Sequence, residues 1–150
     1  MIKIKTIDRV DIFTMPKGKN EAMCVTTNGI IKTNGEAVMG RGIAKAVNDK
    51  YHVAKILADH LKNHGNIPCD LGIYDGFHVL SFPTKNDWRK NSDPELIRQS
   101  AKHLVQLADR LQLIKIYVPK PGCSNGHLDW DKQVKPVIEP ILDDRFIIIL

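Results

Sequence analysis

The sequence NGEAVMGRGIAKAV, residues 34–47, is the stretch on which our interpretation of this chain is built. A β-prone run precedes it at residues 23–27, and an amphipathic helical pattern follows it. Glycine lets a ligand approach the backbone closely, and a helix N-terminus offers free N–H donors with a partial positive charge. The order of strand, glycine-rich loop and helix therefore predicts a site for a phosphate or pyrophosphate group.

This loop differs from the two common nucleotide-binding motifs. Gly35 and Gly40 have the separation found in a P-loop, but Arg41-Gly42 follow where Lys-Ser/Thr is required. The G-x-G-x-x-G spacing of dinucleotide-binding folds is absent as well. The alternative interpretation is a tight turn without a ligand. The choice between a phosphate-binding loop and a simple turn therefore depends on the other loops of the chain.

Length and composition limit the class of protein. We expect residues 1–150 to form a single domain, because this length is typical of one domain with a substantial core. The net charge of +5 permits an anionic partner without requiring one. Three widely spaced cysteines and six histidines form no disulfide framework and no metal-ligand pattern, so no metal and no other cofactor is expected. Without a secretion signal or a long apolar run, the sequence indicates a cytoplasmic protein that does not contact membranes, and no feature specifies an oligomer.

The apolar pattern predicts strands that alternate with helices. We expect strands at residues 2–6, 22–27, 71–74, 77–82, 113–118 and 145–150. We expect one or two helices within 42–63, and further helices within 94–111 and 129–142. Asp75-Gly76 between two β-prone runs predicts a hairpin, and Asp93-Pro94 is typical of a helix start. A hairpin embedded in alternating strands and helices predicts an α/β fold, a three-layer α/β/α sandwich with a mixed central sheet.

Three loops follow predicted strands and carry unusual residues, at 28–42, 83–90 and 119–128. In folds of this class ligands bind beyond the carboxyl ends of the strands, where such loops converge. We therefore expect the three loops to form one site together.

Short motifs in and before these loops resemble those of macrodomains, the ADP-ribose-binding fold. The motifs are Asp11-Ile12-Phe13, VMGRGIA at 38–44, FPTK at 82–85 and GCSNGHLDW at 122–130. They are most similar to the terminal ADP-ribose glycohydrolases and to the antitoxin macrodomains that remove ADP-ribose from thymidine in DNA. The resemblance implies a macrodomain that binds ADP-ribose and hydrolyses an ADP-ribosyl linkage. The acceptor could be a DNA base, a protein carboxylate or a 1″-phosphate, and in the last case the enzyme would be a phosphatase.

The resemblance also implies roles for individual residues. Asp11 would accept a hydrogen bond from the adenine amino group, helped by the Ile12 amide, and Asn28 would lie near the distal ribose. Lys85 would be catalytic, either by attacking the anomeric carbon or by stabilising the leaving group. The other residues implied to contact ADP-ribose are Val38, Met39, Gly40, Arg41, Gly42, Ile43, Ala44, Thr84, Gly122, Cys123, Ser124, Asn125, Gly126, His127 and Leu128.

The sequence departs from the related macrodomains at four places. Gly126 stands where some glycohydrolases carry a catalytic aspartate, and this favours an alternative function as a non-catalytic reader of ADP-ribose. Ser124 and His127 replace glycines of the antitoxin group, and residues 30–36 lengthen the first loop. His127 could serve as an acid or base, or it could simply stand at the loop rim.

Trp88, Arg89 and Lys90 form a basic aromatic cluster close to Lys85. Such residues can stack on a base and contact phosphates, which predicts a transient contact with nucleic acid. A solvated loop with one packing tryptophan is the alternative. A third hypothesis, a nucleic-acid-binding protein without any nucleotide pocket, depends on this cluster alone.

Overall fold

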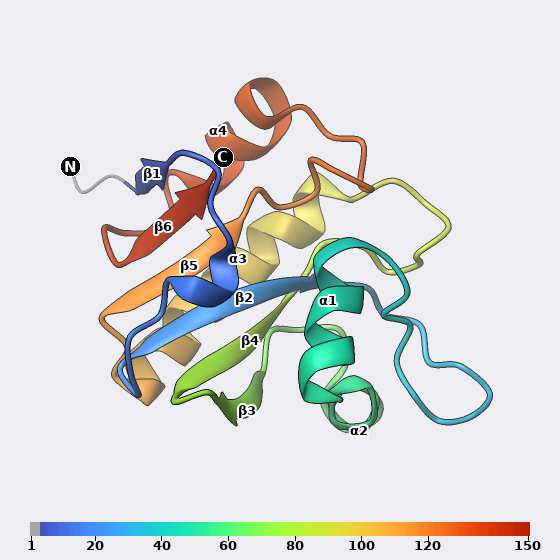
Figure 1. Ribbon diagram of the computed structural model, residues 1–150. Helices are drawn as coiled ribbons and strands as arrows, with labels where there is room; N and C mark the ends of the chain where they lie inside the picture. The colour runs from blue at the N-terminus through green and yellow to red at the C-terminus, as the bar shows by residue number, and fades with distance from the viewer. Residues whose placement is uncertain (1–3) are drawn as a thin grey trace.

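The computed structural model describes residues 4–150 (Figure 1). At its centre lies one six-stranded sheet with the strand order β1-β6-β5-β2-β4-β3. Every neighbouring pair of strands is parallel except β3 and β4, so the predicted mixed sheet is confirmed. The strands are β1 (Lys5–Ile7), β2 (Glu21–Thr27), β3 (Asp70–Tyr74), β4 (Phe77–Pro83), β5 (Lys115–Pro119) and β6 (Phe146–Ile149).

Helices cover both faces of this sheet, which confirms the three-layer sandwich. On one face lie the 3-10 turn η1 (Ile12–Thr14), α1 (Gly42–Tyr51) and α2 (Ala54–His64), and on the other lie α3 (Pro94–Leu111), the π-helical turn η2 (Trp130–Val134) and α4 (Lys135–Ile138). Strand β2 shows why two cores form. Ala22 and Cys24 pack with α3, whereas Met23 and Val25 pack with α1 and α2. Alternate side chains of a strand point to opposite faces, and all four of these are fully buried.

The structure changes some of the predicted boundaries. The apolar pattern over residues 42–63 belongs to two helices, because His52 takes a left-handed conformation with a φ of 56° and ends α1. The pattern over 129–142 becomes η2 followed by the short α4, which ends at Ile138, ahead of Pro140. Strand β5 begins at Lys115, two residues after the predicted start. The part of the first predicted strand that includes Ile2 lies outside the described residues.

The predicted hairpin at Asp75-Gly76 is confirmed, and it joins β3 to β4 in antiparallel directions. Both residues have positive φ values, 51° and 86°, as a tight turn between antiparallel strands requires. The hairpin places β3 at the sheet edge and leaves β4 parallel to β2. Among residues 4–150, no helix combines the length and the apolar character that crossing a membrane would require.

Candidate functional site

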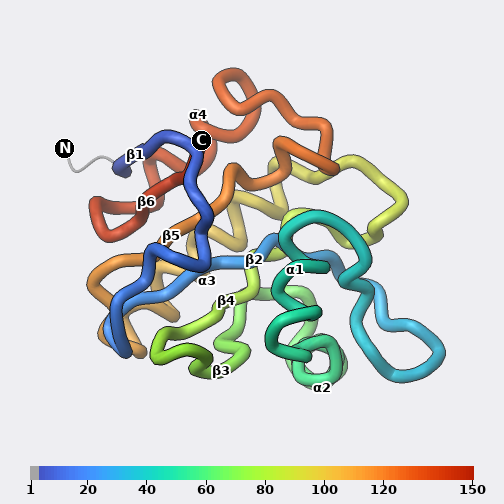
Figure 2. Tube along the Cα trace, viewed as in Figure 1, coloured from blue at the N-terminus to red at the C-terminus, as the bar shows by residue number. Residues whose placement is uncertain are grey.

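The paired ends of β2 and β4 bring the predicted loops together. Thr27, at the end of β2, lies opposite Pro83, at the end of β4. The carbonyl oxygen of Thr27 accepts hydrogen bonds from the backbone N–H groups of Thr84 at 3.0 Å and of Lys85 at 3.4 Å. Strand β5 lies on the other side of β2, so the loops after all three strands leave the same end of the sheet (Figure 2).

A cleft of about 870 Å³ lies at this end of the sheet, and residues from all three loops line it. The three loops therefore meet, as the sequence predicts. A cleft of this size disfavours the hypothesis of a nucleic-acid-binding protein without a nucleotide pocket. The lining includes the predicted residues Ile12, Asn28, Val38, Gly40, Arg41, Gly42, Ile43, Ala44, Thr84, Lys85, Trp88, Arg89, Lys90, Gly122, Cys123, Ser124, Asn125, Gly126 and His127.

Three predicted site residues do not line the cleft. Met39 is buried in the core beneath α1, and Leu128 packs against the core on the α3 side. Asp11 is exposed, and its carboxylate accepts the backbone N–H of Phe13 at 3.1 Å as the cap of η1. Whether any of the lining residues contacts a ligand stays a prediction.

The N-terminus of α1 is open toward the cleft. Arg41 occupies the N-cap position, but its side chain makes no capping hydrogen bond. The first bond along the helix runs from the Lys45 N–H to the Arg41 carbonyl oxygen at 3.2 Å, so the preceding N–H groups have no partner within the helix. Gly42, with a φ of 56°, starts the helix in a conformation that side chains disfavour. This helix end can therefore donate several hydrogen bonds to an anion.

Asn28 holds the base of the first loop. Its side-chain amide donates to the Val38 carbonyl oxygen at 3.1 Å, and its side-chain oxygen accepts the Ile30 N–H at 3.0 Å. The backbone of Ala37 donates to the carbonyl oxygen of Ala54, at the start of α2, at 2.9 Å. The loop is thus tied to both β2 and α2, and its longer tip projects beyond these anchors (Figure 1).

The Lys85 ammonium group connects the second loop with the third. Its Nζ donates to the Asn125 carbonyl oxygen at 3.0 Å and to the Trp88 carbonyl oxygen at 3.4 Å. Partial burial lowers the pKa of Lys85, and the positive charge of Arg41 lowers it further. The side chain of Asn66 supports the same segment by donating to the Lys85 carbonyl oxygen at 3.0 Å. Lys85 is therefore a positioned amine with a lowered pKa that lines the cleft.

Ser92 and Gly126 fit against each other beside this lysine. The backbone N–H of Ser92 donates to the Gly126 carbonyl oxygen at 3.0 Å. A Cβ atom added at Gly126 would lie 2.0 Å from Ser92 Oγ and 2.5 Å from the Gly122 carbonyl oxygen. Since no such contact is tolerated, position 126 cannot carry any side chain, including an aspartate, in this loop conformation.

The lining of the cleft is strongly cationic. It contains no aspartate and no glutamate, and this statement covers the residues that the structure describes. With an open helix N-terminus in the same wall, such a cleft suits a ligand with more than one phosphate. The cations are Arg9, Arg41, Lys85, Arg89, Lys90 and Lys120.

Sequence reasoning missed several lining residues. Arg9 and Val10 follow β1, and Ile149 and Leu150 stand at the end of β6. These residues reach the cleft because β6 lies next to β5 and β1 lies next to β6. No local pattern could have identified them. Ser92, in contrast, belongs to the segment that links β4 to α3, so the rule that sites follow strand ends could have found it.

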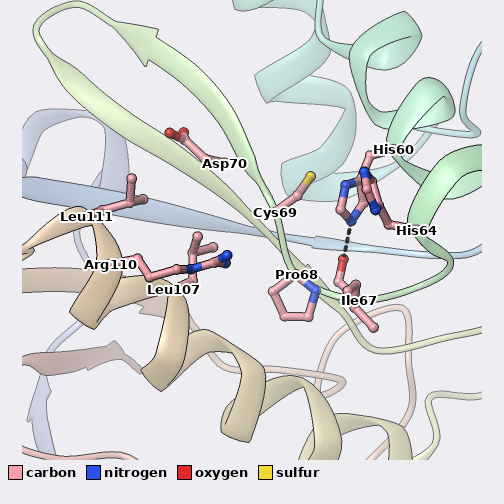
Figure 3. A pocket seen from close by; sticks show the side chains of 9 residues that line it. All are labelled: His60, His64, Ile67, Pro68, Cys69, Asp70, Leu107, Arg110 and Leu111. Atoms are coloured by element: carbon pink, nitrogen blue, oxygen red, sulfur yellow. Dashed lines mark hydrogen bonds between the residues drawn. The ribbon is translucent and has the colours of Figure 1, made fainter.

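A second hollow, of about 450 Å³, lies between α2, the start of β3 and the end of α3 (Figure 3). His60 and His64 stand on its α2 side, and Arg110 stands on its α3 side. The His60 ring is already bonded to the Ile67 carbonyl oxygen at 3.1 Å. Within residues 4–150 no group of three or more histidine, cysteine or acidic side chains is arranged to hold a metal ion. The loop cleft is therefore the candidate site.

Comparisons with known proteins agree with this fold. No protein-family profile matches the sequence. The chain is 29% identical over 122 residues to a DNA ADP-ribosyl glycohydrolase of Mycobacterium tuberculosis, in a match that covers 76% of this chain but only 35% of the length of that relative. The macrodomain of Thermus aquaticus DarG has a TM-score of 0.72 at 22% identity and covers 97% of this chain and 96% of its own.

A second solved structure, Thermosipho africanus DarTG in complex with ADP-ribose, has a TM-score of 0.67 at 24% identity. The match covers 86% of this chain and 37% of that one. The macrodomain fold implied by the sequence motifs is therefore confirmed, and the similarity is to DarG macrodomains.

We predict that Gly126→Ala destabilises the protein by about 1–3 kcal/mol, the usual cost of forcing extra atoms into a packed region. The added methyl group would overlap Ser92 Oγ and the Gly122 backbone. Chemical denaturation measures the change. Gly40→Ala is the matched control, because an added Cβ there meets no atom within 4 Å. Equal stability of the two variants would contradict the prediction.

We also predict that Arg41→Gln raises the pKa of Lys85. The change removes a positive charge that disfavours the ammonium form, while the effect of burial on this pKa remains. An NMR titration of the lysine side chains measures the shift. Lys45→Gln is the control, since Lys45 pairs with Asp49 on the exposed side of α1 and is not among the causes of the shift. A Lys85 pKa that does not move on removal of Arg41 would refute this assignment.

Proposed function

On the premise that this chain is a macrodomain similar to those of DarG, we propose that it binds ADP-ribose in the loop cleft and hydrolyses the bond that joins ADP-ribose to a base in DNA. The observation that carries the proposal is the meeting in one cleft of an uncapped helix N-terminus and six cations, among them a lysine of lowered pKa. The acceptor is taken from the name of the mycobacterial relative, of which the chain spans about a third.

The proposed binding mode follows from the groups that line the cleft. The pyrophosphate lies at the N-terminus of α1, where N–H groups without helical partners can donate to its oxygens. The distal ribose then extends toward Lys85, and the adenine extends toward Ile12 and the ends of β1 and β6. Asp11 borders this end of the cleft, and its carboxylate has acceptor capacity left besides its bond to the Phe13 N–H, so it can accept the adenine amino group.

We propose that Lys85 acts as an ammonium group on the leaving acceptor. Two carbonyl oxygens hold its Nζ, and this favours the charged form, while burial and Arg41 lower the pKa and make the proton easier to donate. Attack by the neutral amine on the anomeric carbon is the alternative route. That route leaves a lysine-linked sugar that borohydride can trap, so trapping distinguishes the two.

The cluster of Trp88, Arg89 and Lys90 is proposed to contact the nucleic acid that carries the ADP-ribose. The Trp88 side chain is 45% exposed at the cleft rim, and the guanidinium of Arg89 lies over its ring at 5.8 Å. Arg89 is also held by Asp87, through bonds of 2.9 and 2.6 Å, so its position is defined before a ligand arrives. A base can stack on the open part of the tryptophan while Lys90 contacts a phosphate.

A reader of ADP-ribose without turnover is the second candidate function. It is favoured by Gly126, which leaves the cleft without an acidic group next to Lys85. The test is a panel of labelled substrates, ADP-ribosylated DNA beside ADP-ribosylated protein and ADP-ribose 1″-phosphate, together with calorimetry of free ADP-ribose. Release from DNA supports the proposed enzyme, heat without release supports the reader, and no heat rejects ADP-ribose as the ligand.

We expect Lys85→Ala to lower turnover about 10²–10⁴-fold, the range for removing a proton-transfer group. ADP-ribose affinity should change little, because the pyrophosphate is held at α1. Calorimetry and a release assay on ADP-ribosylated DNA measure both quantities. Lys102→Ala, on the exposed side of α3, controls for the loss of a surface charge. Unchanged turnover would remove Lys85 from the catalytic machinery.

We further expect Trp88→Ala to weaken the binding of an ADP-ribosylated oligonucleotide by about 1–3 kcal/mol, the usual contribution of base stacking, and to leave free ADP-ribose unaffected. Fluorescence anisotropy with the two ligands separates these effects. Ile114→Ala is the control, because Ile114 is 58% exposed and does not line the cleft. A loss of affinity for free ADP-ribose of the same size would contradict a role in contacting DNA.

A further inference from the structure

Hydrolysis requires a group that takes a proton from water, and the cleft offers few candidates. In either route for Lys85, the last bond to form joins a water oxygen to the anomeric carbon, so one proton of that water must leave. Among the described residues the lining holds no aspartate or glutamate side chain, and the side chain that Gly126 lacks cannot be added. Arginines remain protonated, and Lys85 gives its own proton to the acceptor in the proposed route.

His127 is the one histidine among the residues that line this cleft. It follows Gly126 directly and stands two residues after Asn125, whose carbonyl oxygen holds the Lys85 ammonium group. Its side chain is exposed, and its ring makes no hydrogen bond to any other residue in the range 4–150. Both ring nitrogens are therefore available to a ligand or to water.

The backbone of His127 is also unusual. Four non-glycine residues of the described chain have a positive φ, and three of them end a helix or turn the β3–β4 hairpin: His52, Gln112 and Asp75. The fourth is His127, with a φ of 61°, in a turn closed by its N–H and the Ser124 carbonyl oxygen at 3.1 Å. Strained conformations of this kind concentrate at functional sites. Glycine would adopt this conformation without strain, so the histidine calls for an explanation.

We propose that His127 is the general base that activates the hydrolytic water. The proposal rests on the proposed function and adds a second catalytic residue to it. Histidine is suited to this role, because it is the side chain whose ordinary titration leaves a neutral, proton-accepting nitrogen near pH 7.

In the proposed step every proton and electron pair that leaves one group is taken up by another. The bond from the anomeric carbon to the acceptor breaks with its electron pair going to the acceptor, which takes a proton from the Lys85 ammonium group. The water oxygen bonds to the anomeric carbon, and the proton that it loses passes to a ring nitrogen of His127. Transfer of this proton to the neutral lysine amine restores both groups, and the net change is the addition of one water.

Several segments that line the cleft with His127 carry charged groups. Lys85, Lys90 and Arg89 face the cleft from the loop after β4, and Arg41 faces it from the start of α1. The remaining charged groups of these segments are Arg9, Asp87, Asp93, Lys120 and Asp129. Among the described residues, the charged side chains that line the cleft are all cations, so none of them is an acidic group that could accept the proton in place of His127.

The test measures kcat and KM from pH 5 to 8 with an oligonucleotide that carries ADP-ribose on a base. His127→Asn is the main variant, because asparagine tolerates the left-handed conformation and does not titrate. We expect kcat to fall about 10²–10⁴-fold with KM little changed, and the fall in wild-type activity toward acid pH to disappear. His127→Gly, which relieves the backbone strain, should lose activity equally while remaining folded.

His103→Asn on the exposed side of α3 should leave kcat and the pH profile unchanged. If the wild type turns over and His127→Asn keeps its kcat and its acidic limb, the role of His127 is overturned and the proposed function stands. A rise in KM with unchanged kcat also overturns it, because His127 would then only bind. If the wild type binds ADP-ribose but releases none from any substrate, the proposed hydrolysis itself fails.

Discussion

The parallel pairing of β2 with β4 is the constraint on which the cleft depends. Thr27 lies opposite Pro83, and the Thr27 carbonyl oxygen accepts the N–H groups of both Thr84 and Lys85. These contacts bring the lysine to the end of β2, beside the loop that leads to α1. With β5 on the other side of β2, the third loop reaches the same place, and the bond from Lys85 Nζ to Asn125 closes the arrangement. A shift of β4 by one residue would turn every side chain of this strand to the opposite face.

Several destabilising features lie around this cleft. The described residues contain three buried side-chain polar atoms without a hydrogen-bond partner, Thr27 Oγ1, Asn66 Oδ1 and Ser92 Oγ, and all three residues contact or adjoin the strand ends. The α1 N-terminus lacks a side-chain cap, and the cations of the lining have no carboxylate among them. The open helix end and the cations cost stability unless an anionic ligand satisfies them, and the buried hydroxyls of Thr27 and Ser92 can donate to such a ligand. A group of destabilising features in one place is expected of a functional site rather than of a surface with only a structural role.

Many parts of the fold could be predicted because their signals are local. Asp75-Gly76 gave the hairpin and Asp93-Pro94 gave the start of α3, since turn and cap preferences depend on adjacent residues only. One or two helices were expected within residues 42–63, and the position of the break was not predicted, because the apolar period continues through His52 while the backbone there turns left-handed. The helix predicted to reach residue 142 stops at residue 138, where the chain turns ahead of Pro140.

The sequence by itself determined the alternation of strands and helices, the three loops at strand ends and the motifs that resemble a macrodomain, because these depend on periodicity and on short-range chemistry. Only the tertiary structure decided which side chains share the cleft. It turned Met39 into the core and Leu128 against it, and it brought Arg9 and Leu150 to the lining through the order β1-β6-β5. It also set Ser92 against Gly126 so that no side chain fits there. The physical reason is that strand order and register, set by burial over the whole sheet, fix the distances between segments far apart in the chain.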